Sequence, residues 1–203
     1  MKFYDSVGPN PRIVRMFMAE KGIDMPKQAV DLRKGENREA EHLKRNAHGQ
    51  MPALELDDGS FLSEVIPICE YLEEKTPAPA MVGATAEERA ECRMWTRRID
   101  LNICEHMGNG FRFGEGLKFF EKRILCVPEA SPGLKLIAVN RLQWLDGQMA
   151  GKDYLCGKRF TMTDILLYCW LDFGSTVGQL LDQENKNIVA WMARVAERPS
   201  AKA

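Results

Sequence analysis

The run Thr76-Pro77-Ala78-Pro79-Ala80 divides this chain into two segments whose sequence patterns differ. Two prolines among small residues interrupt helices and strands alike and are typical of a linker. Before the run, strand-like and helix-like segments alternate, whereas after it apolar residues recur at helical spacing throughout. A chain of 203 residues is long enough for two small hydrophobic cores. The sequence therefore predicts an α/β domain over residues 1–76, a linker over 77–86 and an all-helical domain over 87–203.

The segment before the linker predicts the order β-α-β-α-β-β-α. Asn10 followed by Pro11 indicates a helix start with Asn10 as the N-cap, and Gly22 indicates its end. Asp58-Gly59 is typical of a hairpin turn. Alternating strands and helices favour a parallel pair and the hairpin adds antiparallel neighbours, so we expect a mixed four-stranded sheet. The expected strands are 2–6, 28–32, 51–56 and 61–62, with short helical runs within 33–46 and a helix over 64–75.

The segment after the linker predicts a bundle of helices. One start is especially clear, because Thr161 and Asp164 have the spacing of a capping box immediately before an apolar run. The five expected helices are 87–113, 115–126, 134–149, 162–175 and 186–197.

The charge balance excludes two classes of partner. Lys and Arg number 28 against 29 Asp and Glu, which gives a net charge of −1 and no basic surface for nucleic acid or an anionic membrane. No apolar run approaches the ~20 residues of a membrane span. The N-terminus has no apolar leader, so we expect a cytoplasmic protein. The partner is expected to be a small molecule or another protein subunit.

The cysteines predict neither a disulfide framework nor a metal site. No two of them form a CxxC pair, and His42, His48 and His106 have no zinc-finger spacing. In a reducing compartment, thiols within helical patterns act as small hydrophobic side chains. We expect that role for Cys69, Cys92, Cys104, Cys126, Cys156 and Cys169.

Three motifs, in this order around the linker, point to a family. They are Gln50-Met51-Pro52-Ala53-Leu54, then Glu64 opening the helix with Ile68-Cys69-Glu70-Tyr71-Leu72, then the Thr161–Asp164 capping box. With them the chain resembles the cytosolic glutathione transferases, in particular bacterial members of the beta and nu-like classes. The resemblance implies a thioredoxin-like N-terminal domain, an all-helical C-terminal domain, a homodimer, glutathione as co-substrate without a metal, and a role in detoxification.

The resemblance also implies where glutathione binds. Pro52 would be cis, with Gln50 and Met51 beside it facing the cysteinyl part of the tripeptide. Glu64 and Val65 stand where the family has an acid and a Ser or Thr that hold the γ-glutamyl end, so Val65 lacks the hydroxyl and keeps only its backbone N–H. Lys34 would meet the glycine carboxylate, with Arg33 and Arg38 as alternatives, and Asp100 would reach the partner subunit's site.

The residue that activates the thiol stays open between three positions. A hydrogen-bond donor beside the glutathione sulfur favours the thiolate and lowers the thiol pKa. Asn10 falls at the cysteine position of beta-class members and has an amide donor, while Gly8 falls at the hydroxyl position of other classes and offers only an N–H. Ser6 carries a hydroxyl but lies earlier. The expected catalytic residues are therefore Asn10 and Ser6, with a backbone N–H near Gly8 as the alternative.

The acceptor substrate leaves no motif in the sequence. By the resemblance, His106 matches a histidine of beta-class members. With Phe111, Phe113 and Trp170 it is a candidate for an acceptor pocket, although aromatics at helical spacing also build cores. The expected function is transfer of the glutathione thiol to a small electrophilic or peroxide-type acceptor. A non-catalytic glutathione-transferase-like binding or regulatory protein and a glutathione-dependent disulfide reductase are the alternatives.

Overall fold

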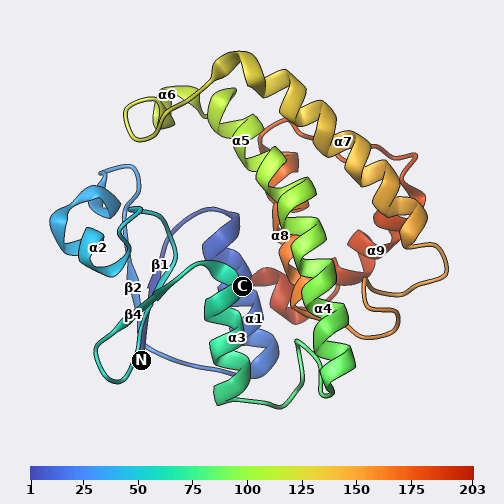
Figure 1. The fold of residues 1–203 in the computed structure, drawn as a ribbon, viewed down its shortest axis with the longest axis horizontal. Coiled ribbons are helices and arrows are strands. Elements are labelled where there is room, and N and C mark those ends of the chain that lie inside the picture. Colours follow the sequence, from blue (N-terminus) through green and yellow to red (C-terminus); the bar gives the residue numbers. More distant parts are fainter. The chain divides into compact units, whose positions relative to one another are not determined.

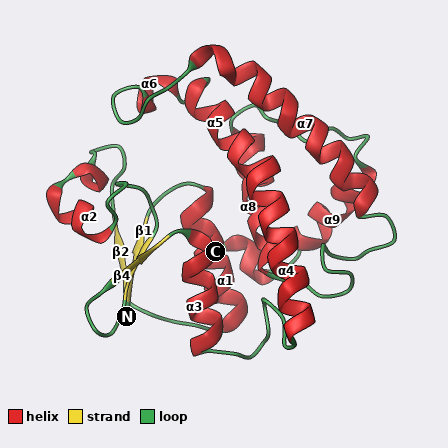
Figure 2. Cartoon of the chain, viewed as in Figure 1, coloured by secondary structure: helices red, strands yellow, loops and turns green.

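The computed structural model describes residues 1–203 and contains two compact units (Figures 1 and 2). The first comprises Met1–Val82 with Pro199–Ala203, and the second comprises Gly83–Arg198. The sequence placed the last five residues in the helical domain, and this was wrong. They pack within the first unit because Arg12 Nη2 donates to Ala201 O at 2.8 Å and Ser200 Oγ donates to Glu20.

The first unit is built on a mixed four-stranded sheet of order β2-β1-β3-β4, as the sequence predicted. The strands β1 and β2 are parallel, and the other two pairs are antiparallel. Strand β2 ends three residues earlier than expected, because the Asp31 carboxylate accepts the N–H groups of Arg33 and Lys34 and turns the chain. The bounds are β1 (Lys2–Asp5), β2 (Lys27–Ala29), β3 (Ala53–Glu55) and β4 (Phe61–Ser63).

Helix α1 (Pro9–Lys21) begins two residues before the predicted start. Gly8, with φ +112°, is its N-cap, and Pro9 occupies the first helical position, where the fixed φ of proline suits a helix. The predicted N-cap was therefore wrong, because Asn10 is the second residue of the helix. The end was predicted correctly, since Gly22 adopts φ +64° and donates its N–H to Ala19 O.

Helices cover both faces of this sheet (Figure 2). Helix α1 packs against α3 (Val65–Lys75) on one face, while the short α2 (Ala40–Arg45) lies on the other. The side chains between the sheet and the helices α1 and α3 are fully buried, and this close packing holds the strand ends in fixed positions. The core residues of the first face include Phe3, Ile13, Phe17, Leu54, Ile68 and Leu72.

The second unit is entirely helical. Its long first helix was predicted as 87–113 and is observed as α4 (Ala86–Ile99), a π-helical segment at Asp100–Cys104 and α5 (Glu105–Phe113). The predicted helix 115–126 was wrong. Only α6 (Leu117–Phe120) forms, and Arg123 N donates to Phe120 O in a tighter turn. The others are α7 (Ser131–Gln148), α8 (Met162–Thr176) and α9 (Lys186–Ala196). None of the helices is long and apolar enough to cross a bilayer.

The predicted capping box at the start of α8 is present. Thr161 N donates to Asp164 Oδ2 at 2.9 Å, and the other carboxylate oxygen accepts Leu155 N at 3.0 Å and Trp191 Nε1 at 2.9 Å. Asp164 thus joins α8 to the preceding loop and to α9. Its side chain is fully buried, and this burial raises its pKa to about 6.

Candidate glutathione site

Four chain segments leave the sheet at one edge. The pairs Tyr4↔Ala53, Ala53↔Ser63 and Asp5↔Ala29 lie at the ends of their ladders. The residues just beyond these pairs therefore emerge side by side at that edge, because paired strands keep a fixed register. They are Ser6 after β1, Val30 after β2, Met51-Pro52 before β3 and Glu64 after β4. The register brings together predicted site residues that are far apart in the sequence.

Two backbone features mark the Pro52 and Glu64 positions. The Met51–Pro52 peptide is cis, as predicted. Glu64, the N-cap of α3, has φ +68° and is the one non-glycine residue of the chain with a positive φ. Such a conformation is costly for a residue with a Cβ and is concentrated at functional sites. No side chain caps α3, so Val65 opens a helix whose first N–H groups can receive an anion.

The loop before Pro52 is held by buried polar side chains that the sequence analysis did not identify. His42 Nε2 lies 3.0 Å from Gln50 O, and Asn46 Nδ2 donates to the same carbonyl at 3.1 Å. Asn37 Nδ2 donates to Gly49 O at 2.6 Å. All three side chains are buried. The sequence signal was polar residues at helical spacing in a charged stretch, which is equally typical of a solvated helix.

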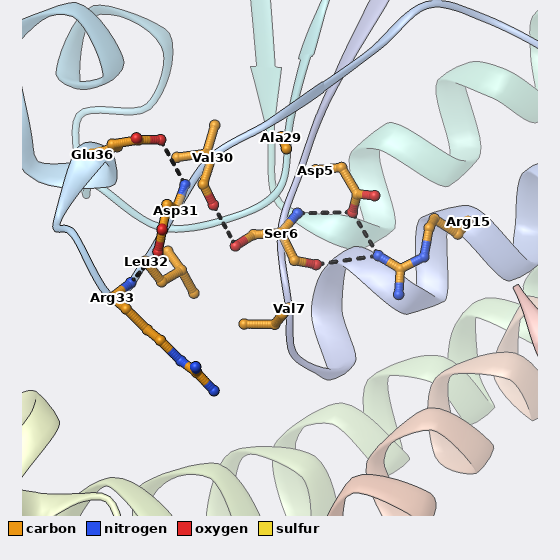
Figure 3. Close-up of a pocket in the computed structure, with 10 residues that line it drawn as sticks. All are labelled: Asp5, Ser6, Val7, Arg15, Ala29, Val30, Asp31, Leu32, Arg33 and Glu36. Atoms are coloured by element: carbon orange, nitrogen blue, oxygen red, sulfur yellow. Dashed lines mark hydrogen bonds and ion pairs between the residues drawn. The ribbon is translucent and has the colours of Figure 1, made fainter.

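A cavity of about 730 Å³ opens at the same edge of the sheet (Figure 3). Of the predicted residues it includes Ser6 and Arg33. Ser6 Oγ donates to Val30 O at 2.7 Å, so its hydroxyl hydrogen already has an acceptor. The cavity is lined by Asp5, Ser6, Val7, Arg15, Ala29, Val30, Asp31, Leu32, Arg33 and Glu36.

The charged side chains around this cavity differ in whether they already contact a partner in the protein. Arg15 Nη1 contacts Asp5 Oδ1 at 2.6 Å and Ser6 O at 3.2 Å, so this cation clamps the turn after β1. The Asp31 carboxylate has a lowered pKa, chiefly because it accepts the Lys34 N–H. Arg33 extends from the loop, and Figure 3 draws no contact between its guanidinium and the lining carboxylates. Arg33 is the cation best placed to meet an anionic ligand.

None of the other predicted residues of this unit lines the cavity. Lys34 is 75% exposed, with Nζ 3.8 Å from Asp31 Oδ2. Arg38 Nη1 donates to His48 O at 3.1 Å. Asn10 is the second residue of α1 and comes three residues after the lining residue Val7.

In the helical unit, two predicted residues flank the π-helical segment. Asp100 opens this segment and His106 follows it on α5. The Nδ1 atom of His106 is buried and has no hydrogen-bond partner in the chain. A π-helical turn often accompanies a functional site, because the extra residue redirects side chains.

The predicted aromatic residues are only partly brought together. Phe173 lies between Phe111 and Trp170, with ring centroids 5.1 Å and 6.0 Å away, both in edge-to-face contact. Phe113 is not among these contacts. Trp170 packs on Gly108, where an added Cβ would lie 2.9 Å from its ring. The cluster is largely a packed core, and Phe173, three residues after Trp170 on α8, was missed.

Comparison with known proteins agrees with this geometry. The family described as "Glutathione S-transferase, N-terminal domain" matches residues 7–75, and "Glutathione S-transferase, C-terminal domain" matches residues 137–199. A glutathione S-transferase domain-containing protein from Marinobacter aquaeolei VT8, known from a crystal structure, is 33% identical in sequence to this chain. The two structures match with a TM-score of 0.91, and the match covers 98% of this chain and 99% of that one. The chain belongs to the glutathione S-transferase family.

Two further relatives show the range of this family. Glutathione S-transferase 2 of Saccharomyces cerevisiae is 29% identical in an alignment that covers this whole chain and 88% of the yeast protein. Elongation factor 1-gamma of Schizosaccharomyces pombe is 31% identical over 134 residues, which are 63% of this chain and 30% of that protein. Sequence similarity thus extends both to a protein named as a transferase and to part of a protein named as an elongation factor.

Proposed function

We propose that this chain binds glutathione across the sheet edge of its first unit and delivers the thiolate to a small electrophilic or peroxide-type acceptor. Glu64 carries the proposal, because its φ of +68° holds a carboxylate at the uncapped start of α3 beside the cis peptide Met51–Pro52. That arrangement offers a carboxylate to an ammonium group, helix N–H groups to a carboxylate, and backbone to an extended peptide. The γ-glutamyl end of glutathione presents both of these charged groups.

Each end of the tripeptide has a partner in this assignment. Glu64 takes the ammonium, and the N–H of Val65 takes the γ-glutamyl carboxylate without the help of a hydroxyl. Arg33 takes the glycine carboxylate, because it lines the cavity and Lys34 does not. Two charged contacts and a rigid backbone edge hold the cysteinyl sulfur in one place, which removes much of the entropic cost of the later bimolecular step.

The activation step lowers the pKa of the bound thiol. A free thiol with a pKa near 8.5 is mostly protonated at neutral pH, and a donor beside the sulfur favours the nucleophilic thiolate. The Ser6 hydroxyl donates to Val30 O instead. The Asn10 side-chain amide and the N–H groups of Gly8 and Asn10 are therefore our candidates, and the thiolate then attacks the acceptor with its electron pair.

Calorimetric titration with glutathione tests the binding site. Glu64→Gln removes a charged hydrogen bond worth about 1.5–3 kcal/mol, so Kd should rise roughly tenfold to a hundredfold. Glu74→Gln, at the exposed far end of the same helix, should leave Kd unchanged. Arg33→Ala should weaken binding more than Lys34→Ala. Equal affinities for the wild type and Glu64→Gln would contradict the proposed site.

A non-catalytic binding protein is the second candidate. It is favoured by the likeness to elongation factor 1-gamma and by Val65 in place of a hydroxyl residue. It is also favoured by the Ser6 hydroxyl, which already donates its hydrogen to Val30 O. Thiolate absorbance of bound glutathione as a function of pH separates the two candidates. An enzyme should show a thiol pKa below that of free glutathione, whereas a binding protein should hold glutathione without this change.

We also propose that the chain forms a homodimer through its helical unit. Apolar side chains 40–43% exposed occur at seven-residue intervals on adjoining helices. The pairs are Met94 with Leu101 and Ile137 with Trp144, and we call these four residues the apolar strip. Trp144 lies 6.3 Å from Trp95 between ring centroids, which joins α7 to α4. A second copy would remove this apolar surface from water.

A further inference from the structure

Two cysteines meet in a buried polar cluster of the helical unit, whereas the proposed glutathione site belongs to the first unit. Cys92 lies on α4 and is fully buried, and Cys156 lies in the loop before α8 and is 4% exposed. Cys92 Sγ is 3.3 Å from Thr163 Oγ1, and Thr161 Oγ1 is 3.8 Å from Cys156 Sγ. Threonines 161 and 163 are neighbours at the start of α8, so both thiols face the same short segment.

A separate set of contacts holds the Cys156 loop over this part of α4. Cys156 forms an antiparallel bridge with Arg159. Arg159 contacts Glu91 Oε2 at 2.5 Å through Nη2 and Glu88 Oε1 at 3.5 Å through Nε. Glu88 and Cys92 are four residues apart and share a face of α4. The loop is therefore fixed by charge pairs to the face of α4 that carries Cys92.

The two thiols also interact with each other, which makes them chemically unequal. The interaction with Cys156 is the largest cause that lowers the pKa of Cys92, and the interaction with Cys92 raises the pKa of Cys156. A second pair in this unit provides a contrast. Cys104 interacts with Cys169, but burial raises its pKa well above the ordinary value. The thiolate is the reactive form of cysteine, so only the first pair has a nucleophile in place.

We propose that Cys92 and Cys156 are a redox-active pair that closes to a disulfide when the protein meets a peroxide. The Cys92 thiolate attacks one peroxide oxygen, an S–O bond forms, the O–O bond breaks, and the leaving hydroxide takes a proton. The Cys156 sulfur then attacks the sulfenic sulfur of Cys92 as its own proton departs; the S–S bond forms and the S–O bond breaks to release water. Two thiols and one hydrogen peroxide give one disulfide and two waters.

Treatment of the intact protein with hydrogen peroxide tests this inference. The intact mass should fall by two hydrogen atoms, and proteolysis without reduction should yield a cross-linked peptide containing positions 92 and 156. Both changes should reverse with dithiothreitol. Cys104→Ala is the matched control, because it removes a buried cysteine of the same helical unit and should leave the cross-link intact. Cys92→Ala and Cys156→Ser should each abolish it.

Other outcomes would overturn the proposal. They are sulfinic or sulfonic acid at Cys92 without a cross-link, a cross-link through other cysteines, or alkylation of both thiols in the peroxide-treated protein to the same extent as in the untreated one. The wild-type measurement decides the matter even if one variant fails to fold. Glutathione affinity measured on the same samples keeps the result distinct from the proposed function, because the redox pair does not require a glutathione site.

Discussion

Single residues decide how this member of the family departs from the familiar pattern. By the resemblance seen in the sequence, Gly8 falls where other classes have a hydroxyl residue, and Val65 falls where a Ser or Thr follows the acidic residue. The Ser6 hydroxyl lies at the cavity but donates to Val30 O at 2.7 Å. In the proposed function, the donors to the glutathione sulfur therefore come from the start of α1. Two of its first three residues are prolines without an N–H, so Asn10 supplies both a backbone and a side-chain donor there.

Substitutions of Asn10 should separate thiol activation from helix stability. Because Gly8 is the N-cap, Asn10→Ala should change unfolding stability by no more than about 0.5 kcal/mol. Loss of a hydrogen bond to a charged group, worth about 1.5–3 kcal/mol, should raise the pKa of bound glutathione by about one to two units at 1.36 kcal/mol each. Thiolate absorbance against pH measures this change.

Asn10→Asp provides the opposing test. A carboxylate in the first turn should stabilise the helix by about 0.3–1 kcal/mol, yet it repels a thiolate. This variant should therefore be at least as stable as the wild type and lose more turnover than Asn10→Ala. If both variants keep the wild-type thiol pKa, the backbone N–H groups near Gly8 are the donors instead.

Asp164 gives the helical unit a defined pH dependence. Burial raises its pKa from 3.8 to about 6, so between these values the folded chain binds more protons than the unfolded chain. Its contribution to stability is full below pH 3.8 and is lost as the pH rises through 6, a change of about 3 kcal/mol at 1.36 kcal/mol per pKa unit. Relative to Asp164→Asn, the wild type should lose stability across this window in urea unfolding. A constant difference would show that the hydrogen bonds to Asp164 cancel the effect of burial.

Pairs of elements are fastened by buried polar contacts as well as by apolar packing. Lys21 at the end of α1 has a fully buried side chain, and its Nζ lies 2.6 Å from Glu73 Oε2 on α3 and from Pro79 O. Glu73 Oε1 accepts the N–H groups of Met81 and Val82. This carboxylate thus secures the chain after α3, which the sequence had marked only as a linker.

Lys21→Met should destabilise the first unit by about 3–5 kcal/mol, because it leaves the Glu73 charge without its cation. Lys44→Met is the matched control. It breaks the ion pair between Lys44 and Glu41, whose side chains are 73% and 65% exposed respectively. The loss should cost no more than about 1 kcal/mol of unfolding free energy. Urea unfolding measures both. The double variant Lys21→Met/Glu73→Gln should lose less than the sum of the single variants, and strict additivity would argue against a direct pair.

Features with a local cause were predictable from the sequence, and those that depend on distant contacts were not. The hairpin at Asp58-Gly59, the end of α1 at Gly22 and the capping box of α8 are each specified by the residue types at those positions. The packing of Pro199–Ala203 in the first unit depends on Arg12, nearly the whole chain away. The hydrogen bonds that Asn37, His42 and Asn46 make to the carbonyl oxygens of Gly49 and Gln50 likewise depend on burial by other elements. The cis peptide at Pro52 was predictable because a proline-entered strand defines it, whereas which loop cation lines the cavity, Arg33 or Lys34, depends on how the loop after β2 folds.

At the scale of the whole molecule, each unit has its own core, and they differ in what they leave on the surface. The first unit has a sheet covered by helices on both faces, and Phe3, Phe17 and Leu54 are fully buried between them. The second unit leaves Met94, Leu101, Ile137 and Trp144 each 40–43% exposed. Isolated exposed apolar residues are ordinary, whereas several that lie together on adjoining helical segments mark a surface that another protein can cover. The apolar strip is consequently where we expect a second copy to bind.

A charge placed in the apolar strip should therefore separate the dimer. Light scattering during gel filtration at micromolar concentration should give twice the chain mass of 23.1 kDa for the wild type. Leu101→Glu should give the single-chain mass, because burying an unpaired carboxylate costs more than the apolar contact returns. Leu180→Glu is the control: this leucine is 72% exposed but lies between α8 and α9, outside the strip, and its variant should stay dimeric. A monomeric wild type that still binds glutathione would remove the strip as an interface, and with it the expected role of Asp100 in the partner's site.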